Sequence, residues 1–464
     1  MNVFLKLMKI EKNNMRNILI FIDNDVCFRH FIMNSTFKDV CLNNNVKFVF
    51  PEENNKRIDN IVFEKKYFNS DVVRLHQDKT RVRTWKYLLY INQLRWRFGQ
   101  QNKIIRKQRK FNLGWKAYYL FKCMGLPIIW NVYKFFKLKF IITNKYQDLE
   151  RLIIEFKPDI FIHPSTLDSL YINDLIYYGK KKSIKTFVLM NSWDNPSTKN
   201  TVFDYPDALL VWGEQTKSHA VQFMKIPNKK VNIFGAAQFE IFKSKSIKNK
   251  KEFKSQYKIN NEKIILYAGS SKGTNELMHL DILDKAIQDG KIINTKIIYR
   301  PHPWGGGGAN GEKILEQKWK NIFIEQEFIQ YLQNIANGIN KKFLSDYVNT
   351  HCTLSNIDYV ISPLSTIIIE AAMHGKSSLC FLPKEPNAKH MNIEVDLIHF
   401  QDIFNNDLVY KANTNIDLIN TVNRMLNDDN LNKQKELIEF SRYFIKDFKK
   451  SYSERLNELI CKLE

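Results

Sequence analysis

The sequence predicts an α/β protein made of two Rossmann-like domains that face a cleft. Its 464 residues exceed what one compact core usually fills. Short apolar runs alternate with helical segments in two successive series, which is typical of parallel sheets flanked by helices. A lysine-rich segment with few apolar residues begins near Ser244 and separates the two series. We therefore expect one domain over residues 1–245 and a second over residues 246–464.

Buried parallel strands are predicted where a short apolar run stops at small or polar residues, as a strand does at the carboxyl edge of a sheet. The runs in the first domain are Arg16–Asp23, Val46–Phe50, Pro158–Pro164, Lys185–Trp193, Asp207–Gly213 and Lys230–Ala236. Those in the second domain are Lys263–Ser271, Thr295–Pro303, Asn321–Gln326, Ile357–Thr366 and Ser377–Pro383. Helical segments lie between most of them, so each domain is predicted to be a βαβ series.

The first domain is predicted to carry a basic helical insertion over about residues 81–142. Residues 81–111 have apolar side chains at helical spacing, with Arg and Lys on the remaining face. Residues 113–142 are rich in aromatic side chains, but five lysines interrupt them, which favours an interfacial or core helix over a membrane span. Two interpretations stay open. The aromatic residues contact an anionic membrane, or they fill the core while the basic face binds an anionic acceptor.

The net charge of the chain is +23, from 71 Lys and Arg against 48 Asp and Glu. This excess favours phosphates, anionic lipid or nucleic acid as partners. Six scattered cysteines without paired spacing predict neither a disulfide framework nor a zinc site, which fits a reducing cytoplasm. Charged residues interrupt the N-terminal stretch, so we expect no secretory signal. The predicted location is cytoplasmic, with peripheral contact to the inner membrane face.

Two strand ends in the second domain carry groups suited to a phosphate. After the first, Gly269, Ser270 and Ser271 let backbone N–H groups and hydroxyls approach an anion. After the second, Arg300 supplies a permanent cation, and the prolines on both sides of His302 fix the direction of its ring. A capped turn without a ligand is the structural alternative.

A third strand end opens a helix. Ser362, Ser365 and Thr366 lie at that point, and Glu370 follows about one turn later. Hydroxyls and N–H groups at a helix N-terminus bind anions, while a carboxylate one turn deeper can accept hydrogen bonds from a ribose or a sugar. Three such strand ends in one domain predict a ligand that carries phosphate.

Glycines occupy positions 305–308 and 311, directly after the His302 turn. Such a segment predicts a mobile loop that closes over a bound ligand. A surface excursion without ligand contact is the alternative.

The order of several motifs resembles bacterial surface-polysaccharide transferases of the GT-B fold. The motifs are SWDNPSTKN, PDALLVWGEQTKSHAVQFMKIPNKKVNIFGAAQFE, YRPHPWGGG and DYVISPLSTIIIEAAMHGKSSLCF. The chain is most similar to the broad group that includes capsule glycosyltransferases and CDP-glycerol glycerophosphotransferases, over roughly residues 155–385. The resemblance implies that His302, Ser365 and Thr366 lie on the nucleotide side of the cleft.

The resemblance implies an inverting glycosyltransferase that moves a sugar from a nucleotide donor to a cell-surface polysaccharide or a lipid-linked glycan. Helix dipoles, hydroxyls and Arg or His side chains would stabilise the leaving phosphate, so we expect neither a cofactor nor a required metal ion. A polyol-phosphate transferase acting on CDP-glycerol is the first alternative. A non-enzymatic binder of nucleic acid or of a membrane surface is the second, although no nucleic-acid motif is visible.

The acceptor side is predicted at strand ends of the first domain, because side chains there should face the cleft. The candidate acceptor contacts are Arg29, Trp193, Asn195 and Lys199, and the candidate catalytic bases are Asp194, Asp168 and His30. A structural turn that buries Trp193 is the alternative for the residues around Asp194. Packing or capping is the alternative for His30.

Overall fold

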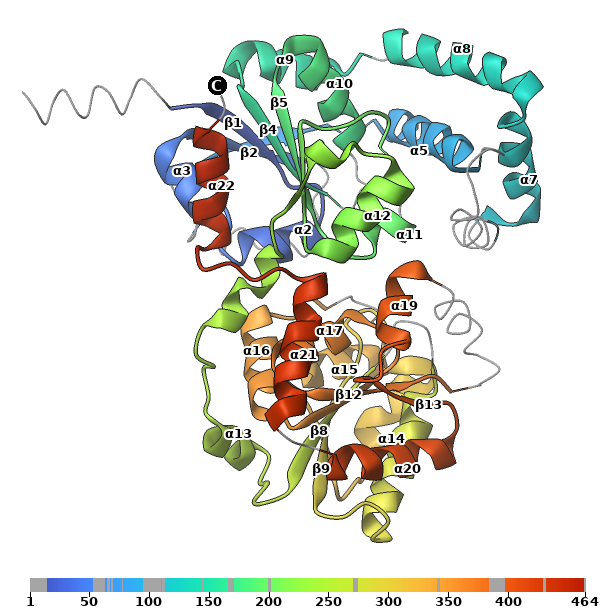
Figure 1. Ribbon diagram of the computed structural model, residues 1–464, viewed down its shortest axis with the longest axis vertical. Coiled ribbons are helices and arrows are strands. Elements are labelled where there is room, and N and C mark those ends of the chain that lie inside the picture. The colour runs from blue at the N-terminus through green and yellow to red at the C-terminus, as the bar shows by residue number, and fades with distance from the viewer. Residues whose placement is uncertain are drawn as a thin grey trace, which may run out of the picture. The chain divides into compact units, whose positions relative to one another are not determined.

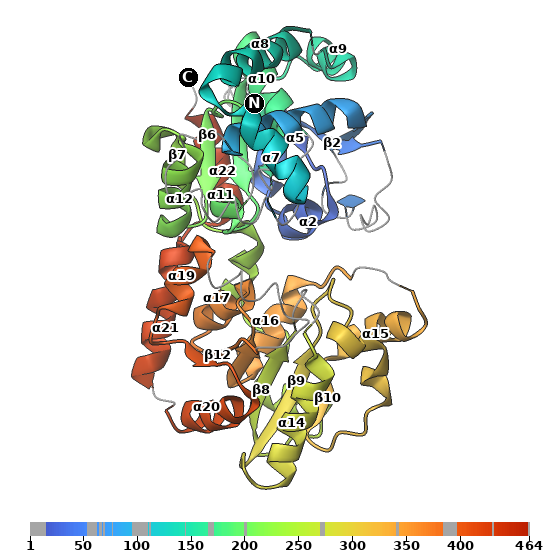
Figure 2. The same ribbon diagram turned by 90° about the vertical axis from the view of Figure 1, so that its right-hand side faces the viewer.

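The computed structural model divides the chain into two compact units, one formed by Met1–Glu240 with Ile445–Glu464 and the other by Ile241–Phe444. It describes residues 15–52, 63–64, 67, 70–76, 78–94, 110, 113–143, 145–165, 171–198, 202–269, 274–339, 343–383, 397–428 and 431–462 (Figure 1). Each unit is a parallel sheet covered by helices (Figures 1 and 2). The sequence placed the domain boundary at residue 245, and the structure divides the chain after Glu240.

The first unit is built on a seven-stranded sheet with the order β3-β2-β1-β4-β5-β6-β7, in which the described strands all pair in parallel. The strands are β1 (Asn17–Phe21), β2 (Asn45–Pro51), β3 (Asp71–Leu75), β4 (Ile160–Ser165), β5 (Lys185–Met190), β6 (Ala208–Val211) and β7 (Val231–Ile233). Ile18 and Ile20 of β1 enter one hydrophobic core, and Leu19 and Phe21 enter another. Burial on both faces explains the continuous apolar run.

Helices surround this sheet. They are α2 (Asp25–Cys27), η1 (Phe28–Ile32), α3 (Lys38–Asn43), α5 (Lys79–Leu94), α7 (Trp115–Met124), α8 (Pro127–Thr143), α9 (Gln147–Phe156), α10 (Ile172–Lys182), α11 (Asn195–Thr198), α12 (Glu214–Met224), η2 (Asn228–Lys230), η3 (Ala237–Lys243) and α22 (Tyr452–Cys461).

The second unit contains a six-stranded parallel sheet with the order β10-β9-β8-β11-β12-β13. Its strands are β8 (Lys263–Ala268), β9 (Thr295–Arg300), β10 (Ile322–Ile324), β11 (Tyr359–Ser362), β12 (Ser377–Phe381) and β13 (Tyr410–Ala412). Its helices are α13 (Lys250–Gln256), α14 (Glu276–Gln288), η4 (Gly308–Glu316), η5 (Gln326–Phe328), α15 (Ile329–Ala336), α16 (Tyr347–Asn356), α17 (Thr366–Met373), α19 (Ile398–Phe404), α20 (Asn415–Asn427) and α21 (Leu431–Phe444).

The predicted strands are confirmed, because each apolar run named above overlaps one strand of the structure. Two strands were not predicted, β3 and β13. β3 keeps most of its side chains partly or fully exposed, and β13 has only three residues, so neither produces a sustained apolar run.

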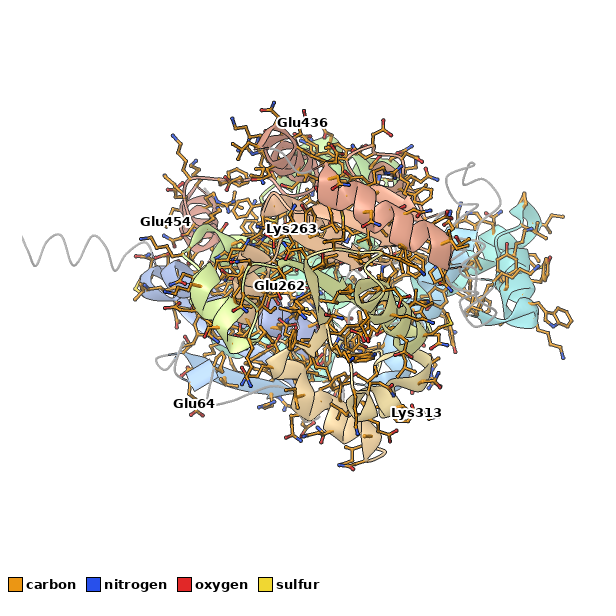
Figure 3. All side chains as sticks on the ribbon, turned by 90° about the horizontal axis from the view of Figure 1, so that it is seen from below. Glu64, Glu262, Lys263, Lys313, Glu436 and Glu454 are labelled. Carbon is orange, nitrogen blue, oxygen red and sulfur yellow. The ribbon has the colours of Figure 1, made fainter. Side chains whose placement is uncertain are left out.

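The end of the chain returns to the first unit. Helix α22 carries Glu454, which is labelled in Figure 3. The helix begins with a capping box between Ser451 and Glu454 and packs against α3. Arg455 fixes the helix in place, because its Nη1 donates to the carbonyl oxygen of Phe234 at 2.7 Å. The sequence assigned residues 445–464 to the second domain. They lie in the first unit because their apolar side chains fill the core beside β1.

The predicted insertion is helical where the structure describes it, in α5, α7 and α8. Helix α5 starts at Lys79 and is described to Leu94, so the predicted continuation over residues 95–109 lies outside the described residues. Among the described helices, none combines the length and apolar character that crossing a membrane requires.

Candidate active site

The second sheet has a topological switch point at β8. This strand lies between β9 and β11, so the strand order reverses around it, and ligands of open α/β sheets bind outside the carboxyl ends at such a point. Gly269 directly follows β8, and its N–H donates to the carbonyl oxygen of Arg300 at 2.8 Å. The neighbouring end of β11 is Ser362. The topology therefore brings together all three strand ends singled out in the sequence.

Two serines pair at the end of β11. The hydroxyl oxygens of Ser362 and Ser365 lie 2.9 Å apart, and Ser362 is completely buried. Ser365 is the N-cap residue of α17, with an extended backbone, and its side chain does not cap the helix. The N–H groups in the first turn of a helix have no acceptor within the helix. This strand end therefore offers a hydroxyl pair and the N-terminus of a helix to an anion.

His302 presents one ring nitrogen as a donor. The backbone N–H of Trp304 donates to Nδ1 of His302 at 3.1 Å, which places the proton of the neutral ring on Nε2. A backbone hydrogen bond stabilises the turn that begins at His302, because Gly305 N–H donates to the carbonyl oxygen of His302 at 2.9 Å. The side chain is half-buried. His302 can thus donate from Nε2 to an oxygen at this edge of the sheet.

The glycine segment forms a compact turn. Gly306, Gly307 and Gly308 have positive φ angles, which favour glycine. A Cβ atom on Gly308 would lie 2.2 Å from the carbonyl oxygen of Thr274, and one on Gly311 would lie 1.6 Å from that of Gly306. Gly308 and Gly311 therefore permit close backbone packing beside α14. The closing of this segment over a ligand stays a prediction.

A buried carboxylate beside Gly269 was missed by the sequence analysis. Glu276 opens α14 and is fully buried, and it accepts a hydrogen bond from the phenol of Tyr299 at 2.5 Å. Its side chain occupies the space that a Cβ on Gly269 would need. The N-cap Asn275 before it was the available signal, but a cap does not reveal which distant residue the next side chain contacts.

Arg300 is engaged inside the second unit. It is 7% exposed, and its guanidinium donates to both carboxylate oxygens of Glu325 and to the hydroxyl of Thr350. Burial alone would lower the pKa of Arg300, but the carboxylates around it, Glu325 first, outweigh burial and raise that pKa. This pairing differs from the direct phosphate contact predicted from the sequence, since Glu325 already occupies the fork of the guanidinium.

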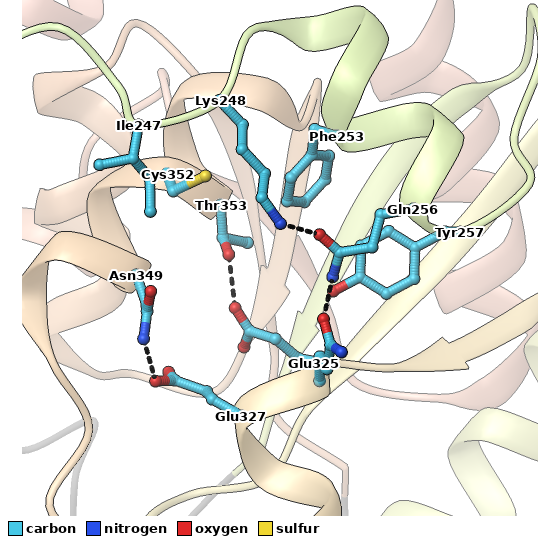
Figure 4. Close-up of a pocket in the computed structure, with 11 residues that line it drawn as sticks. Ile247, Lys248, Phe253, Gln256, Tyr257, Glu325, Glu327, Asn349, Cys352 and Thr353 are labelled. Carbon is cyan, nitrogen blue, oxygen red and sulfur yellow. Dashed lines mark hydrogen bonds between the residues drawn. The ribbon is translucent and has the colours of Figure 1, made fainter.

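Glu325 also lines a pocket of about 240 Å³ next to α13 and α16 (Figure 4). Thr353 donates to it there, and Asn349 donates to Glu327 at 2.9 Å. Glu370 of α17 is buried as well, and its charge is among those that raise the pKa of Arg300. Arg300 thus lies among buried carboxylates, and its positive charge offsets their negative charge.

The first unit has a buried polar cluster at the carboxyl ends of β1, β4 and β5. His30 lies in η1 after β1, and its Nδ1 lies against the side-chain and backbone oxygens of Asn191 after β5. Both partners are acceptors, so Nδ1 carries the proton. Burial lowers the pKa of His30 to about 3. His30 is therefore neutral at pH 7, with Nε2 as its basic nitrogen.

The same cluster contains a pair of carboxylates that the sequence analysis overlooked. Asp23 and Asp25 follow β1 directly and are buried, and Asp23 lies 3.7 Å from Nε2 of the buried His163. Burial lowers the pKa of His163. Within the described part of the chain, no group of three or more Cys, His, Asp or Glu residues is arranged to hold a metal ion.

The turn around Asp194 has the geometry of a helix start. Thr198 Oγ1 donates to Asp194 Oδ2 at 3.0 Å, and Trp193 and Asn195 are buried. Arg29 is half-buried in η1 beside His30. The other predicted site residues, Asp168, Lys199, Ser270 and Ser271, lie outside the described residues.

Known structures resemble this chain in fold. A UDP-GlcNAc 2-epimerase from Neisseria meningitidis bound to UDP-GlcNAc aligns with a TM-score of 0.51 at 12% identity, over 96% of this chain and 100% of its own. The epimerase from Methanocaldococcus jannaschii gives 0.50 at 12% identity, over 95% and 99%. The glycotransferase of kitacinnamycin gives 0.50 at 9% identity, over 97% and 100%.

No family model and no curated protein matches the sequence. The structural likeness extends over almost the whole of each chain, and both units contribute a parallel sheet. The chain therefore has the two-domain α/β GT-B fold.

Proposed function

We propose that this protein is a glycosyltransferase that moves a sugar from a nucleotide-activated donor to a cell-surface polysaccharide or a lipid-linked glycan. The observation that carries the proposal is the set of donors at the switch point of the second sheet. The Ser362–Ser365 hydroxyl pair and the start of α17 follow β11, and His302 follows β9, so these groups lie at the strand ends on either side of β8. Together they suit the phosphate oxygens of a nucleotide donor.

In the proposed reaction the sugar leaves a nucleoside phosphate, and negative charge develops on the leaving oxygen. Nε2–H of His302 and the N–H groups of α17 would stabilise that charge in the way a metal ion does elsewhere. Glu370, one turn inside α17, would accept hydrogen bonds from the ribose or the sugar hydroxyls. The reaction as proposed inverts the anomeric carbon, because an acceptor hydroxyl displaces the phosphate in one step.

The acceptor hydroxyl must lose a proton, and we assign this step to His30 ahead of Asp194. Nδ1 of His30 is held by Asn191, so the basic Nε2 has a fixed direction. Asp194 already accepts hydrogen bonds from Thr198. A His30→Gln variant should lose most of its turnover, whereas Asp194→Asn should keep more than His30→Gln does. If Asp194→Asn lost more turnover than His30→Gln, Asp194 would be the base instead.

The test is a donor panel. The purified protein is incubated with UDP-, GDP-, CMP- and CDP-sugars and with CDP-glycerol, and nucleotides and sugars are followed by NMR with and without a glycan acceptor. UDP-GlcNAc comes first, since one structural neighbour binds it. We expect a nucleotide-sugar to be consumed only with acceptor, and equally well in EDTA. Consumption of CDP-glycerol alone would indicate a polyol-phosphate transferase, and sugar epimerisation without nucleotide release would contradict transfer.

A further inference from the structure

The helical insertion of the first unit has an inner and an outer side. Helix α7 packs against both α5 and α8, and a small core of its own contains Trp85, Trp130 and Tyr133. The insertion is anchored at Asp174 of α10, which accepts hydrogen bonds from Arg81 at 2.5 Å and from Trp85 at 3.1 Å. Some of the aromatic residues of the insertion are thus interior residues.

The opposite side of α7 and α8 is apolar and exposed. Ile128 is 91% exposed, and Trp115 and Phe135 are each 63% exposed. The outer face consists of Trp115, Leu120, Ile128, Val132, Phe135, Phe136, Leu138 and Ile142. On α8 these residues recur at helical spacing, on the side away from the buried Trp130 and Tyr133. Several large apolar side chains exposed on one face of a helix in this way mark an interaction site.

The outer face lies in the most basic part of the sequence. Residues 79–147 contain seventeen Lys and Arg and no Asp or Glu. Lys134 and Lys139 are exposed on α8 between the apolar side chains, and Lys116 is exposed beside Trp115. The partner must therefore accept aromatic and aliphatic side chains and supply negative charge at the same surface.

We propose that the outer face of α7 and α8 docks on a lipid bilayer with anionic headgroups. A bilayer interface buries the apolar side chains at the depth of the acyl boundary while phosphates meet the lysines, and α8 would lie in the plane of the membrane. Nucleic acid would leave the apolar side chains in water. A second copy would bring two strongly positive surfaces together. The proposal uses none of the residues proposed for catalysis.

The experiment is co-sedimentation of the full chain with vesicles. One set contains phosphatidylcholine alone, and the other contains phosphatidylcholine with about one third phosphatidylglycerol, each at low and high salt. We expect pelleting with the anionic vesicles at low salt, reduced at high salt because screening weakens each lysine contact. Absence of pelleting with anionic vesicles at low salt would overturn the proposal, as would equal pelleting with neutral vesicles.

Variants separate the apolar from the charged contribution. Ile128→Ser/Phe135→Ser should weaken binding by at least about tenfold, since each side chain loses its transfer from water. Ile416→Ser/Leu431→Ser is the matched control, because Ile416 and Leu431 are 74% and 73% exposed on helices of the second unit. The control should bind like the native chain. Equal losses in both pairs would contradict a specific docking face.

The charged contribution is tested in the same way. Lys134→Gln/Lys139→Gln should weaken binding by about tenfold, while Lys285→Gln/Lys435→Gln removes the same charge from exposed positions on α14 and α21 and should have little effect. Sedimentation velocity without lipid tests whether a second copy of the chain covers the outer face instead of a membrane. A dimer that the Ile128/Phe135 variant abolishes, together with no vesicle binding, would replace the membrane with a second copy.

Discussion

The phenol of Tyr299 on β9 donates a hydrogen bond to the fully buried carboxylate of Glu276 at the start of α14, over 2.5 Å. This contact places a carboxylate directly against the end of β8, where only a residue without a side chain fits. A Cβ at Gly269 would lie 2.3 Å from Oε2 of Glu276. The pair thus couples the core of the second sheet to the strand end proposed to bind phosphate.

Gly269→Ala should therefore destabilise the protein by about 1–3 kcal/mol, because the added methyl group displaces Glu276. Urea unfolding monitored by circular dichroism measures the change. Glu276→Ala removes the carboxylate and should relieve the clash. The double variant Gly269→Ala/Glu276→Ala is therefore expected to lose less unfolding free energy than the sum of the losses in the two single variants. Strict additivity of the two costs would show that the methyl group does not meet Glu276.

Arg300→Met should cost about 3–5 kcal/mol of unfolding free energy, since it leaves the carboxylate of Glu325 buried without its cation. Arg300→Met/Glu325→Leu should recover most of that loss, as an apolar pair replaces the ion pair. Calorimetry with the nucleotide then separates structure from binding. We expect the stable double variant to bind nucleotide nearly as well as the native chain. A loss of nucleotide affinity of more than about tenfold would instead indicate that Arg300 contacts the phosphate directly.

His302→Ala should lower turnover by about 10²–10⁴, the range for a lost acid or charge-stabilising group. His302→Gln is the matched variant, because the amide nitrogen of glutamine can occupy the place of Nε2 and still donate. We expect it to keep more activity than His302→Ala. Turnover is followed by nucleotide release with the donor identified in the panel, and near-native turnover of His302→Ala would remove this residue from the mechanism.

Ser365→Ala/Thr366→Val should weaken nucleotide binding about tenfold, since each hydroxyl to a charged phosphate oxygen contributes more than a neutral hydrogen bond. Isothermal titration calorimetry provides the affinity. Ser441→Ala is the control, because that hydroxyl donates to the carbonyl oxygen of Ile438 on α21. An unchanged affinity in the double variant would exclude this strand end as the phosphate site.

Acid should destabilise the protein below about pH 6.5. The pKa of His30 is about 3 in the folded chain because the ring is buried, whereas an unfolded histidine binds its proton near pH 6.5. Between these values the unfolded state binds more protons, so stability is present above pH 6.5 and is lost as the pH falls. The loss is about 1.4 kcal/mol per pH unit for this histidine.

The pKa of His374 is lowered to about 4 by burial, so it adds to the loss over its own, narrower range. Urea unfolding between pH 7 and pH 5 measures the combined slope. His30→Gln should reduce that slope by about one proton. A slope that this variant leaves unchanged would mean that His30 is protonated in the folded chain.

Local patterns predicted much of this fold. Buried strands such as β8 and β11 carry continuous apolar runs, and their polar ends identify the carboxyl edge without knowledge of any partner. The helix start at Ser365 was predicted for the same reason, because a cap is a local feature.

The contacts that sequence did not predict join residues far apart in the chain. Arg300 was predicted to contact phosphate, and the structure pairs it with Glu325, a partner that nothing in the intervening residues specifies. Glu276 next to Gly269 and the acceptor Asn191 beside His30 are of the same kind. The Asp23–Asp25 pair was visible in the sequence and was overlooked.

The return of α22 makes the first unit discontinuous in sequence. Its core includes Leu456 and Ile460 from the last turns of the chain, together with Ile18 and Ile20 from the first strand. During synthesis this core stays incomplete until residues 445–464 have been translated, while every residue of the second unit has already been made. A messenger truncated before residue 445 would thus yield a product with a finished second unit and an unfinished first one. Such products expose apolar surface, which makes them substrates for chaperones and proteases.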